Sequence, residues 1–144
     1  MEIIVAKNRE QIVFCKDVLF AFRSNLEEAT YVDLIMNMIA NESFQLAYIA
    51  SDDKTKAVAF VGYRIMHMLR TSWQVYIDDL YTDPGNRGKG YAGALLDFVD
   101  NFAKNRKIDF VHLDSGYMLN DAHRLYLNKG FVLACNHFAK NLPA

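Results

Sequence analysis

Apolar and polar residues follow two different periods along this chain, and the points where the period changes divide it into elements. Segments 8–24 and 27–40 carry apolar residues every three or four positions, the spacing that gathers them on one face of a helix. From residue 43 to residue 82 the apolar runs are rich in β-branched and aromatic residues and are separated by short polar turns, which favours strands. We therefore predict, in chain order, a strand at 2–6, helices at 8–24 and 27–40, and strands at 43–50, 56–69 and 72–82.

The second half of the chain contains the clearest helical pattern. Apolar residues from 91 to 103 form one stripe, and the polar residues between them face away from it, as in a helix packed on a core. After this helix we predict a strand at 108–113, a helix at 119–129 and a last strand at 131–139. Asn120 or Asp121 is the expected N-cap of the later helix, and Gly130 is its expected C-terminal stop.

The segment between the predicted strand at 72–82 and the next helix is rich in glycine. It reads Asp-Pro-Gly-Asn-Arg-Gly-Lys-Gly-Tyr-Ala-Gly over residues 83–93. A strand that turns through glycines into a helix leaves backbone N–H groups free at the helix N-terminus, and these groups, with the helix dipole, favour a phosphate or pyrophosphate. The sequence thus predicts a phosphate-bearing cofactor, and its candidate contacts are Arg87, Gly88, Lys89, Gly90, Tyr91, Ala92 and Gly93.

Two patterns compete for this segment. G-x-G-x-x-G over residues 88–93 matches a dinucleotide fingerprint, and Asp114 lies about 20 residues further on, where that fingerprint has its ribose-binding acid. We reject it because residues 83–87 separate the glycines from the strand, and because only about 50 residues follow, too few for a doubly wound sheet. A Walker loop is excluded because no Gly-Lys-Ser or Gly-Lys-Thr occurs. The second pattern is R-x-x-G-x-A over residues 87–92, preceded by Pro84.

This second pattern resembles the pyrophosphate loop of the GNAT superfamily, the acyl-CoA-dependent N-acyltransferases. Two flanking segments add to the resemblance: Tyr-Ile-Asp-Asp-Leu-Tyr-Thr at 76–82 is similar to the family's central strand, and Ala-His-Arg-Leu-Tyr-Leu-Asn-Lys-Gly-Phe at 122–131 is similar to a later helix and strand. The resemblance implies an α/β (α+β) fold whose central sheet is mixed, mostly antiparallel and flanked by helices. It also implies an N-acetyltransferase that uses acetyl-CoA as co-substrate.

The resemblance implies roles for particular residues. Backbone N–H groups around Leu80, Tyr81 and Thr82 would bind the pantetheine arm and polarise the acetyl carbonyl. Tyr126 lies where the family places the tyrosine that protonates the leaving thiolate, although helix packing also explains it. Asn120 lies one residue nearer to Tyr126 than the family's asparagine, so it is either a cofactor contact or the cap of its helix.

The amine acceptor also requires a base, because a primary amine is almost wholly protonated at neutral pH. Asp78 is the first candidate, since several members of the family carry an acid at this place in the strand. Alternation along the strand puts Asp78 and Asp79 on opposite faces, so that only one of them can point into a given cleft. Asp114, at the end of the next predicted strand, is the second candidate. The alternative is that Asp114 has only a structural role, as a cap or turn residue.

Other polar residues receive structural interpretations. His123 and His137 most simply pack or form structural hydrogen bonds, and no pair of histidines has metal-ligand spacing, so no metal is expected. Ser115 has no Ser-His-Asp context. Three residues of the strand at 56–69 could line the acceptor site or be solvated: Arg64, His67 and Met68.

Length and composition restrict the remaining possibilities. A chain of 144 residues suggests one domain over 1–144, and a net charge of −1 gives no support for nucleic-acid binding. No apolar run is long enough for a membrane span. Cys15 and Cys135 lack paired or metal-type spacing, which indicates buried free thiols in a reducing compartment and hence a cytoplasmic protein.

Partners are predicted only as classes. The candidate acids indicate a cationic amine acceptor, either a small molecule or a peptide. The resemblance adds a homodimer as an expectation of the family. An alternative function is a non-catalytic acyl-CoA sensor or regulatory module of the same fold.

Overall fold

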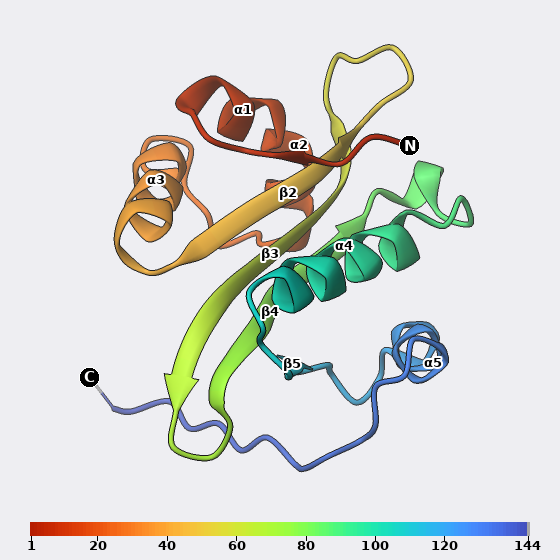
Figure 1. Ribbon diagram of the computed structural model, residues 1–144. Helices are drawn as coiled ribbons and strands as arrows, with labels where there is room; N and C mark the ends of the chain where they lie inside the picture. Colours follow the sequence, from red (N-terminus) through yellow and green to blue (C-terminus); the bar gives the residue numbers. More distant parts are fainter. Residues whose placement is uncertain (144) are drawn as a thin grey trace. The chain divides into compact units, whose positions relative to one another are not determined.

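The computed structural model describes residues 1–143 as two compact units (Figure 1). The first unit spans Met1–Leu113, and the second begins at Asp114. The first unit contains the sheet, and the second contains the helix α5 (Asn120–Asn128). The single domain over 1–144 therefore stays a prediction. Among the helices of the described residues, none is long and apolar enough to cross a membrane.

The sheet has five strands that lie in the same order as in the chain. Their bounds are β1 (Ile4–Val5), β2 (Phe44–Ala50), β3 (Ala57–Met68), β4 (Ser72–Thr82) and β5 (Val111–Leu113). The first four strands pair antiparallel, whereas β4 and β5 run parallel and are connected through a helix. This arrangement confirms the predicted mixed and mostly antiparallel sheet.

Helices flank both faces of this sheet (Figure 1). The helices of this unit are α1 (Arg9–Phe14), α2 (Lys16–Phe22), α3 (Tyr31–Asn41) and α4 (Tyr91–Asn105). On β3, the Phe60 ring lies 6.2 Å from that of Phe22 in α2, whereas the Tyr63 ring lies 4.9 Å from that of Phe102 in α4. Phe60 and Tyr63 are an odd number of positions apart and so point to opposite faces. The first half of β3 is therefore buried on both sides, which explains its almost unbroken apolar sequence.

The single helix predicted at 8–24 is two helices. The side-chain oxygen of Asn8 accepts a hydrogen bond of 2.9 Å from the N–H of Gln11 and caps α1. The helix is interrupted at Cys15, and α2 begins at the next residue. The spacing of the apolar residues does not reveal this interruption. Cys15 is buried as predicted, and burial raises the pKa of its thiol to about 12. Cys135, in contrast, is exposed.

The predicted last strand at 131–139 is wrong. Residues 131–143 have irregular structure, and no strand ladder of the described residues includes them. A strand persists only when a neighbouring strand accepts and donates its backbone hydrogen bonds, and apolar residues alone do not supply one. Much of the apolar surface in this segment is exposed, at Val132, Leu133, Phe138 and Leu142.

Candidate active site

The glycine-rich segment forms a short turn, η1 (Pro84–Asn86), followed by two glycines in the left-handed region of backbone space. Gly88 has φ +79° and Gly90 has φ +81°, values that other residues adopt only with strain. A Cβ atom built on either glycine would meet no heavy atom within 4 Å. The backbone of this loop therefore borders open space, because neither glycine has a side chain that would fill it.

The helix α4 begins directly from this loop. Gly90 is its N-cap and provides no side-chain acceptor, so no side chain of the described residues caps the N–H groups at the start of the helix, which belong to Tyr91, Ala92 and Gly93. The positive end of the helix dipole lies at the same place, and the neighbouring Arg87 and Lys89 add positive charge. This combination of free donors, dipole and cations suits an anion such as a phosphate.

Side-chain hydrogen bonds hold the loop in shape. Asn86 donates to the Asp83 carboxylate at 3.1 Å, and Lys89 donates to the side-chain oxygen of Asn86 at 3.1 Å. Arg87 donates through Nε to the carbonyl oxygen of Thr82 at 3.0 Å. The loop conformation is thus fixed by the chain itself, which lowers the entropy lost when a ligand binds.

The edge of β4 that faces away from β3 is open beyond Ile77. The pairing of β4 with β5 covers only Val75–Ile77. The N–H of Asp83 donates to a carbonyl of the β3 side, that of Val58, at 2.8 Å. Because hydrogen-bonding groups alternate between the two edges of a strand, the N–H groups of Leu80 and Thr82 lie on the open edge. That of Tyr81 lies on the β3 edge, and its ring packs 5.2 Å from that of Phe22.

A polar atom without a partner lies at the end of the same strand. The side-chain hydroxyl of Thr82 is buried and has no hydrogen-bond partner among the described residues. Buried hydroxyl groups of this kind usually bond to protein, water or ligand. Thr82 therefore places an unsatisfied hydroxyl group close to the end of β4.

A β-bulge at Asp78 corrects the predicted orientation of the two aspartates. Gly62 pairs with Asp79 and the next residue, Tyr63, pairs with Ile77, so Asp78 is an extra residue in β4. The extra residue breaks the alternation on which the prediction of opposite faces depended. A Cβ built on Gly62 would lie 3.8 Å from the Asp79 carboxylate.

Both aspartates lie on the Phe44 side of the sheet. The same built Cβ on Gly62 would lie 2.9 Å from the Phe44 ring, which places Phe44 on the face of Asp79. The guanidinium of Arg64 lies over this ring, 5.3 Å from its centroid, and binds Asp78. The bulge thus brings the two carboxylates to one face, and sequence alternation missed it.

Each of the two carboxylates is paired with an arginine. Both oxygens of Asp78 accept from Arg64, at 2.6 Å from Nη2 and 3.0 Å from Nε. Asp79 accepts from Nε of Arg23 at 2.7 Å and also from Nη2. Glu42 adds a second carboxylate 3.6 Å from Arg64. Two arginines therefore offset most of the negative charge of this cluster.

Burial raises the pKa of Asp79 above its usual value, and this effect outweighs the opposite effect of Arg23. Its side chain is 19 % exposed, whereas that of Arg23 is 48 % exposed. Asp79 is thus a candidate proton acceptor that the sequence interpretation did not select. The signal that could have found it is the presence of two consecutive acids near the end of a strand.

Tyr126 lies in α5 of the second unit, and the end of that helix fixes its ring. Gly130 has φ +92°, its N–H donates to Leu127, and the N–H of Phe131 donates to the carbonyl of Tyr126 at 3.0 Å. This is a Schellman motif, which confirms Gly130 as the helix stop. The Phe131 ring packs edge-on against Tyr126, with centroids 5.8 Å apart. Burial raises the pKa of the Tyr126 phenol, so it keeps its proton at neutral pH.

The start of α5 differs from the prediction. The N–H of His123 donates to the carbonyl of Leu119 at 3.0 Å, so Leu119 is the N-cap and neither Asn120 nor Asp121 caps the helix. Asn120 is the first residue of α5 instead. The ring of His123 lies 2.8 Å from the carbonyl oxygen of Gly116, a structural hydrogen bond as expected.

Asp114 lies at the first position of the second unit. Its carboxylate is 3.3 Å from Nδ1 of His137, and its side chain is 41 % exposed. The hydroxyl of Ser115 is buried without a hydrogen-bond partner among the described residues. Of the candidates in this unit, Asp114 and Tyr126 are therefore each held by a local contact.

Two remaining candidates lie away from these groups. His67 stacks on Trp73 with ring centroids 3.9 Å apart, and Met68 is exposed at the tip of the β3–β4 hairpin. Within residues 1–143, no group of three or more His, Cys, Asp or Glu side chains is arranged to hold a metal ion. The first unit therefore brings together the glycine loop, the open edge of β4 and the aspartate pair.

Comparison with known proteins agrees with this arrangement. The model of the acetyltransferase (GNAT) family matches residues 13–131. An uncharacterized N-acetyltransferase of Bacillus subtilis (strain 168), YhdJ, is 29% identical over 124 residues, which are 85% of this chain and 86% of that protein.

Solved structures share the fold. The ribosomal-protein-alanine N-acetyltransferase from Brucella melitensis biovar Abortus 2308 matches with a TM-score of 0.79 and 17% identity, over 99% of this chain and 100% of that chain. The structure of AAC(6')-Iy in complex with the bisubstrate analog CoA-S-monomethyl-acetylneamine matches with a TM-score of 0.83 and 12% identity, over 100% of each chain. The family match covers most of the chain, and this protein belongs to the GNAT acetyltransferase family.

Proposed function

We propose that this chain is an N-acetyltransferase that transfers an acetyl group from acetyl-CoA to a primary amine by direct attack, without a covalent enzyme intermediate. The observation that carries the proposal is the open space in front of Gly88 and Gly90, at the uncapped N-terminus of α4. A pyrophosphate group fits this site because it needs several backbone donors, a positive potential and close approach to the chain. The cofactor contacts proposed here are Arg87, Gly88, Lys89, Gly90, Tyr91, Ala92 and Gly93.

The open edge of β4 supports the binding of the rest of the cofactor. Bound acetyl-CoA would supply an activated thioester. The N–H groups of Leu80 and Thr82 are free to donate there, and donors placed where negative charge develops lower the barrier to acyl transfer. The N–H of Tyr81 faces β3, so we assign Tyr81 a packing contact with the cofactor site through its ring.

We assign removal of the amine proton to the aspartate pair on β4. Asp78, the first candidate, has both oxygens bonded to Arg64, which leaves it fewer lone pairs for a proton. Asp79 has a raised pKa and a single bonded oxygen, so we favour Asp79 as the acceptor, directly or through a water. Asp114, bonded to His137, stays the second candidate.

Tyr126 is the proposed acid for the leaving thiolate. Its raised pKa keeps the phenol protonated, and the Schellman motif holds its ring. Asn120, at the first turn of the same helix, is the remaining proposed cofactor contact.

The acceptor is proposed only as a class, a primary amine of a small molecule or peptide. One structural relative is named a ribosomal-protein-alanine N-acetyltransferase, and another is a complex with a bisubstrate analog, CoA-S-monomethyl-acetylneamine. Both names are compatible with an amine acceptor. The charges of the β4 aspartates offer little support for a cationic acceptor, because Arg23 and Arg64 neutralise both of them. A homodimer and a cytoplasmic location stay predictions.

A calorimetric titration with acetyl-CoA, combined with turnover of a panel of amines, tests the proposal. We expect Kd in the micromolar range, about −8 kcal/mol, with NADH showing no binding. Tyr126→Phe should keep this affinity and lose about 100-fold in kcat, since it removes only the donated proton. No binding of acetyl-CoA would overturn the proposal. Binding without turnover of any amine would instead favour the acyl-CoA sensor.

A further inference from the structure

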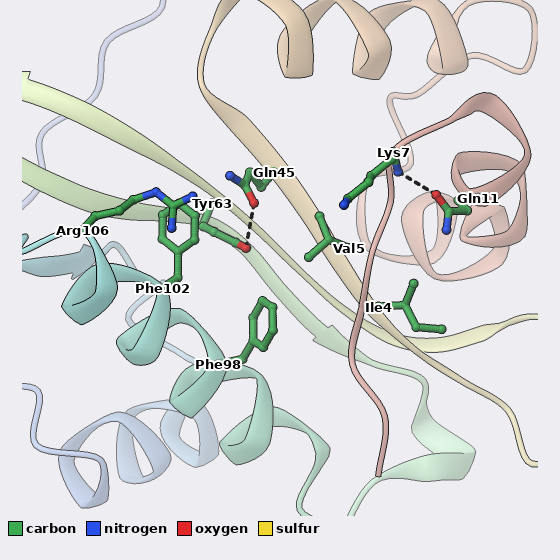
Figure 2. Close-up of a pocket in the computed structure, with 9 residues that line it drawn as sticks. All are labelled: Ile4, Val5, Lys7, Gln11, Gln45, Tyr63, Phe98, Phe102 and Arg106. Carbon is green, nitrogen blue, oxygen red and sulfur yellow. Dashed lines mark hydrogen bonds between the residues drawn. The ribbon is translucent and has the colours of Figure 1, made fainter.

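A groove lies in the first unit between α4, the N-terminal strand and the sheet (Figure 2). Its volume is about 650 Å³, within the range of sites that hold small molecules. The side chains that define its chemistry come from four places in the chain, the segment after β1, β2, β3 and α4 with its C-cap: Lys7, Gln45, Tyr63, Phe98, Phe102 and Arg106. The groove is not needed for the proposed acetyl transfer.

The groove lies away from the glycine loop along α4. Phe98, Phe102 and Arg106 occupy the second half and the C-terminal cap of this helix, whereas the loop precedes its first residue. At 1.5 Å per residue, Arg106 is about 24 Å from Gly90. A ligand in the groove and a pyrophosphate at the loop would therefore occupy different sites.

The polar groups of the groove are donors and cations. None of its lining residues is acidic, and neither Lys7 nor Arg106 forms an ion pair with a carboxylate of the described residues. The hydroxyl of Tyr63 donates to the side-chain oxygen of Gln45 at 3.1 Å, so the NH₂ group of Gln45 stays available as a donor. A site with two unpaired cations and a free amide donor favours an anionic ligand rich in acceptors.

Arg106 is positioned for such a ligand before it binds. Its guanidinium lies over the Phe102 ring, with Cζ 3.7 Å from the centroid, and Figure 2 shows it turned toward Tyr63. Stacking uses the face of the guanidinium and leaves the N–H groups at its edge to bond a carboxylate. The packed ring restricts the rotamers of Arg106, which lowers the entropy cost of binding.

The apolar part of the groove is aromatic. Three aromatic residues line it, Phe98, Phe102 and Tyr63 (Figure 2). Tyr63 and Phe102 are buried, whereas Phe98 is half-buried. The Tyr63 and Phe102 rings meet edge to face, with an interplanar angle of 75°. Phe98, which lies beside this packed pair, accepts a further flat ring more readily than a flexible chain, because rings pack offset or edge-on at low entropy cost.

We propose that this groove binds a small organic anion with one aromatic ring, an aryl carboxylate in its simplest form. The carboxylate bonds Arg106, the amide of Gln45 donates a further hydrogen bond, and the ring packs on the half-buried Phe98. Lys7, on the other side of the groove, adds positive charge (Figure 2). The ligand thus reaches the protein at a second site, on the face of the sheet that α4 covers.

Three probes separate the contributions of charge and ring. Phenylacetate has both, 2-phenylethanol has the ring alone, and acetate has the charge alone. In NMR titrations of the full chain we expect saturable one-to-one binding of phenylacetate with Kd below about 1 mM, and at least tenfold weaker binding of the other two. Shifted amide signals should include residues of β2 and of the second half of α4.

Substitutions localise the site. Arg106→Gln should weaken phenylacetate binding about five- to tenfold, because it removes the charged hydrogen-bond donor. Lys7→Gln should weaken it about twofold, because it removes a positive charge on the other side of the groove. Arg70→Gln, which removes an exposed arginine at the hairpin tip, is the matched control and should leave the affinity unchanged. All three residues are exposed, so the fold should survive, and far-UV circular dichroism checks this.

Several results would overturn the proposal. These are equal affinity for the three probes, full affinity of both Arg106→Gln and Lys7→Gln, and absence of saturable binding up to 10-fold above the expected Kd. Displacement of phenylacetate by acetyl-CoA would also overturn it, since the probe would then occupy the cofactor site. Affinity of the chain for acetyl-CoA is measured separately, so failure here leaves the proposed acetyl transfer untouched.

Discussion

At the scale of single residues, the opposing effects on Asp79 explain its unusual chemistry. Its carboxylate is largely buried, which disfavours the charged form, yet it bonds Arg23, which favours that form. The net result is a raised pKa, because burial is the larger effect and the nearby Asp78 carboxylate adds to it. The bulge at Asp78 creates this situation by turning a second carboxylate toward the same face.

The raised pKa of Asp79 predicts how stability depends on pH. A group with a higher pKa in the folded state holds its proton more tightly there than in the unfolded chain, so its contribution is full below the unfolded pKa and is lost as pH rises through the folded pKa. Asp79→Asn removes this titration. The free energy of unfolding of the wild type, minus that of Asp79→Asn, should therefore decrease from the acidic side toward neutral pH.

Urea unfolding at several pH values above about 3 measures this difference. Asp53→Asn is the informative control, because hydrogen bonds from Ser51 and Thr55 lower the pKa of that carboxyl. Its difference should have the opposite slope, rising as pH increases. Equal slopes for the two variants would contradict the assignment of a raised pKa to Asp79.

Sequence alone pointed to the backbone geometry of the loop but not to that of the aspartates. The glycines at 88 and 90 are readable because positive φ and close approach of a ligand both require the absence of a side chain. The bulge cannot be predicted from the sequence, because it depends on how β3 and β4 pack against the Phe44 ring on one face and α4 on the other. The prediction that Asp78 and Asp79 lie on opposite faces was therefore wrong.

At the scale of elements, the loop before α4 gives the sharpest test of the cofactor site. Gly88→Ala puts a methyl group into the open space in front of the loop and strains a residue at φ +79°. We expect Kd for acetyl-CoA to rise about tenfold, about 1.4 kcal/mol. Calorimetry measures this directly.

Gly85→Ala is the matched control for this substitution. Gly85 belongs to the same loop, lacks a positive φ, and its built Cβ would lie 3.4 Å from a carboxylate oxygen of Asp83. Its effect on the affinity for acetyl-CoA should stay below about twofold. Similar losses in both variants would mean that general disturbance of the loop, and not the open space at Gly88, explains the result.

The end of α5 is a second element whose geometry supports a proposed function. Gly130→Ala forces a Cβ into the left-handed region, which costs about 1 kcal/mol and disturbs the turn that packs Phe131 on Tyr126. We expect kcat to fall several-fold while Kd for acetyl-CoA stays within about twofold. Steady-state kinetics and calorimetry together give both values.

Gly116→Ala serves as the control for Gly130→Ala. Gly116 lies in the same unit without a positive φ, and its built Cβ would lie 3.8 Å from Leu119, an ordinary contact. This variant should keep the wild-type kcat, and its free energy of unfolding should stay within about 0.5 kcal/mol of the wild-type value. If Gly130→Ala retained full kcat as well, the turn would not position a reacting tyrosine.

Some element boundaries can be predicted from the local sequence, and others cannot. The bounds of β4 and the N-terminus of α4 follow directly from turn residues and from the switch between periods. The break at Cys15 and the N-cap at Leu119 do not, since both depend on backbone hydrogen bonds that many sequences can form. The last predicted strand failed for a different reason, because apolar content does not provide a partner.

At the scale of the whole molecule, burial is unevenly distributed. Every fully buried side chain of the described residues lies in the first unit, where β2, β3 and α4 supply most of the core. Residues 131–143 instead expose Val132, Leu133, Phe138 and Leu142. An extended segment with such side chains offers unpaired backbone groups to another strand. If two copies of the chain paired through residues 131–143, this segment would form the interface of the predicted homodimer.

Hydrogen exchange at two protein concentrations tests this prediction. In the monomer, amides of β2 and β3 should exchange slowest, since opening them requires global unfolding, and amides of 132–139 should exchange nearly as in an unfolded chain. If a second copy pairs with the segment, these amides become protected as concentration rises, and light scattering reports a doubled mass. Fast exchange at 132–139 in a particle of doubled mass would place the dimer contact elsewhere. Fast exchange in a particle of single mass would contradict the homodimer itself, and the exposed apolar residues would then belong to an extended segment that the chain leaves unpaired.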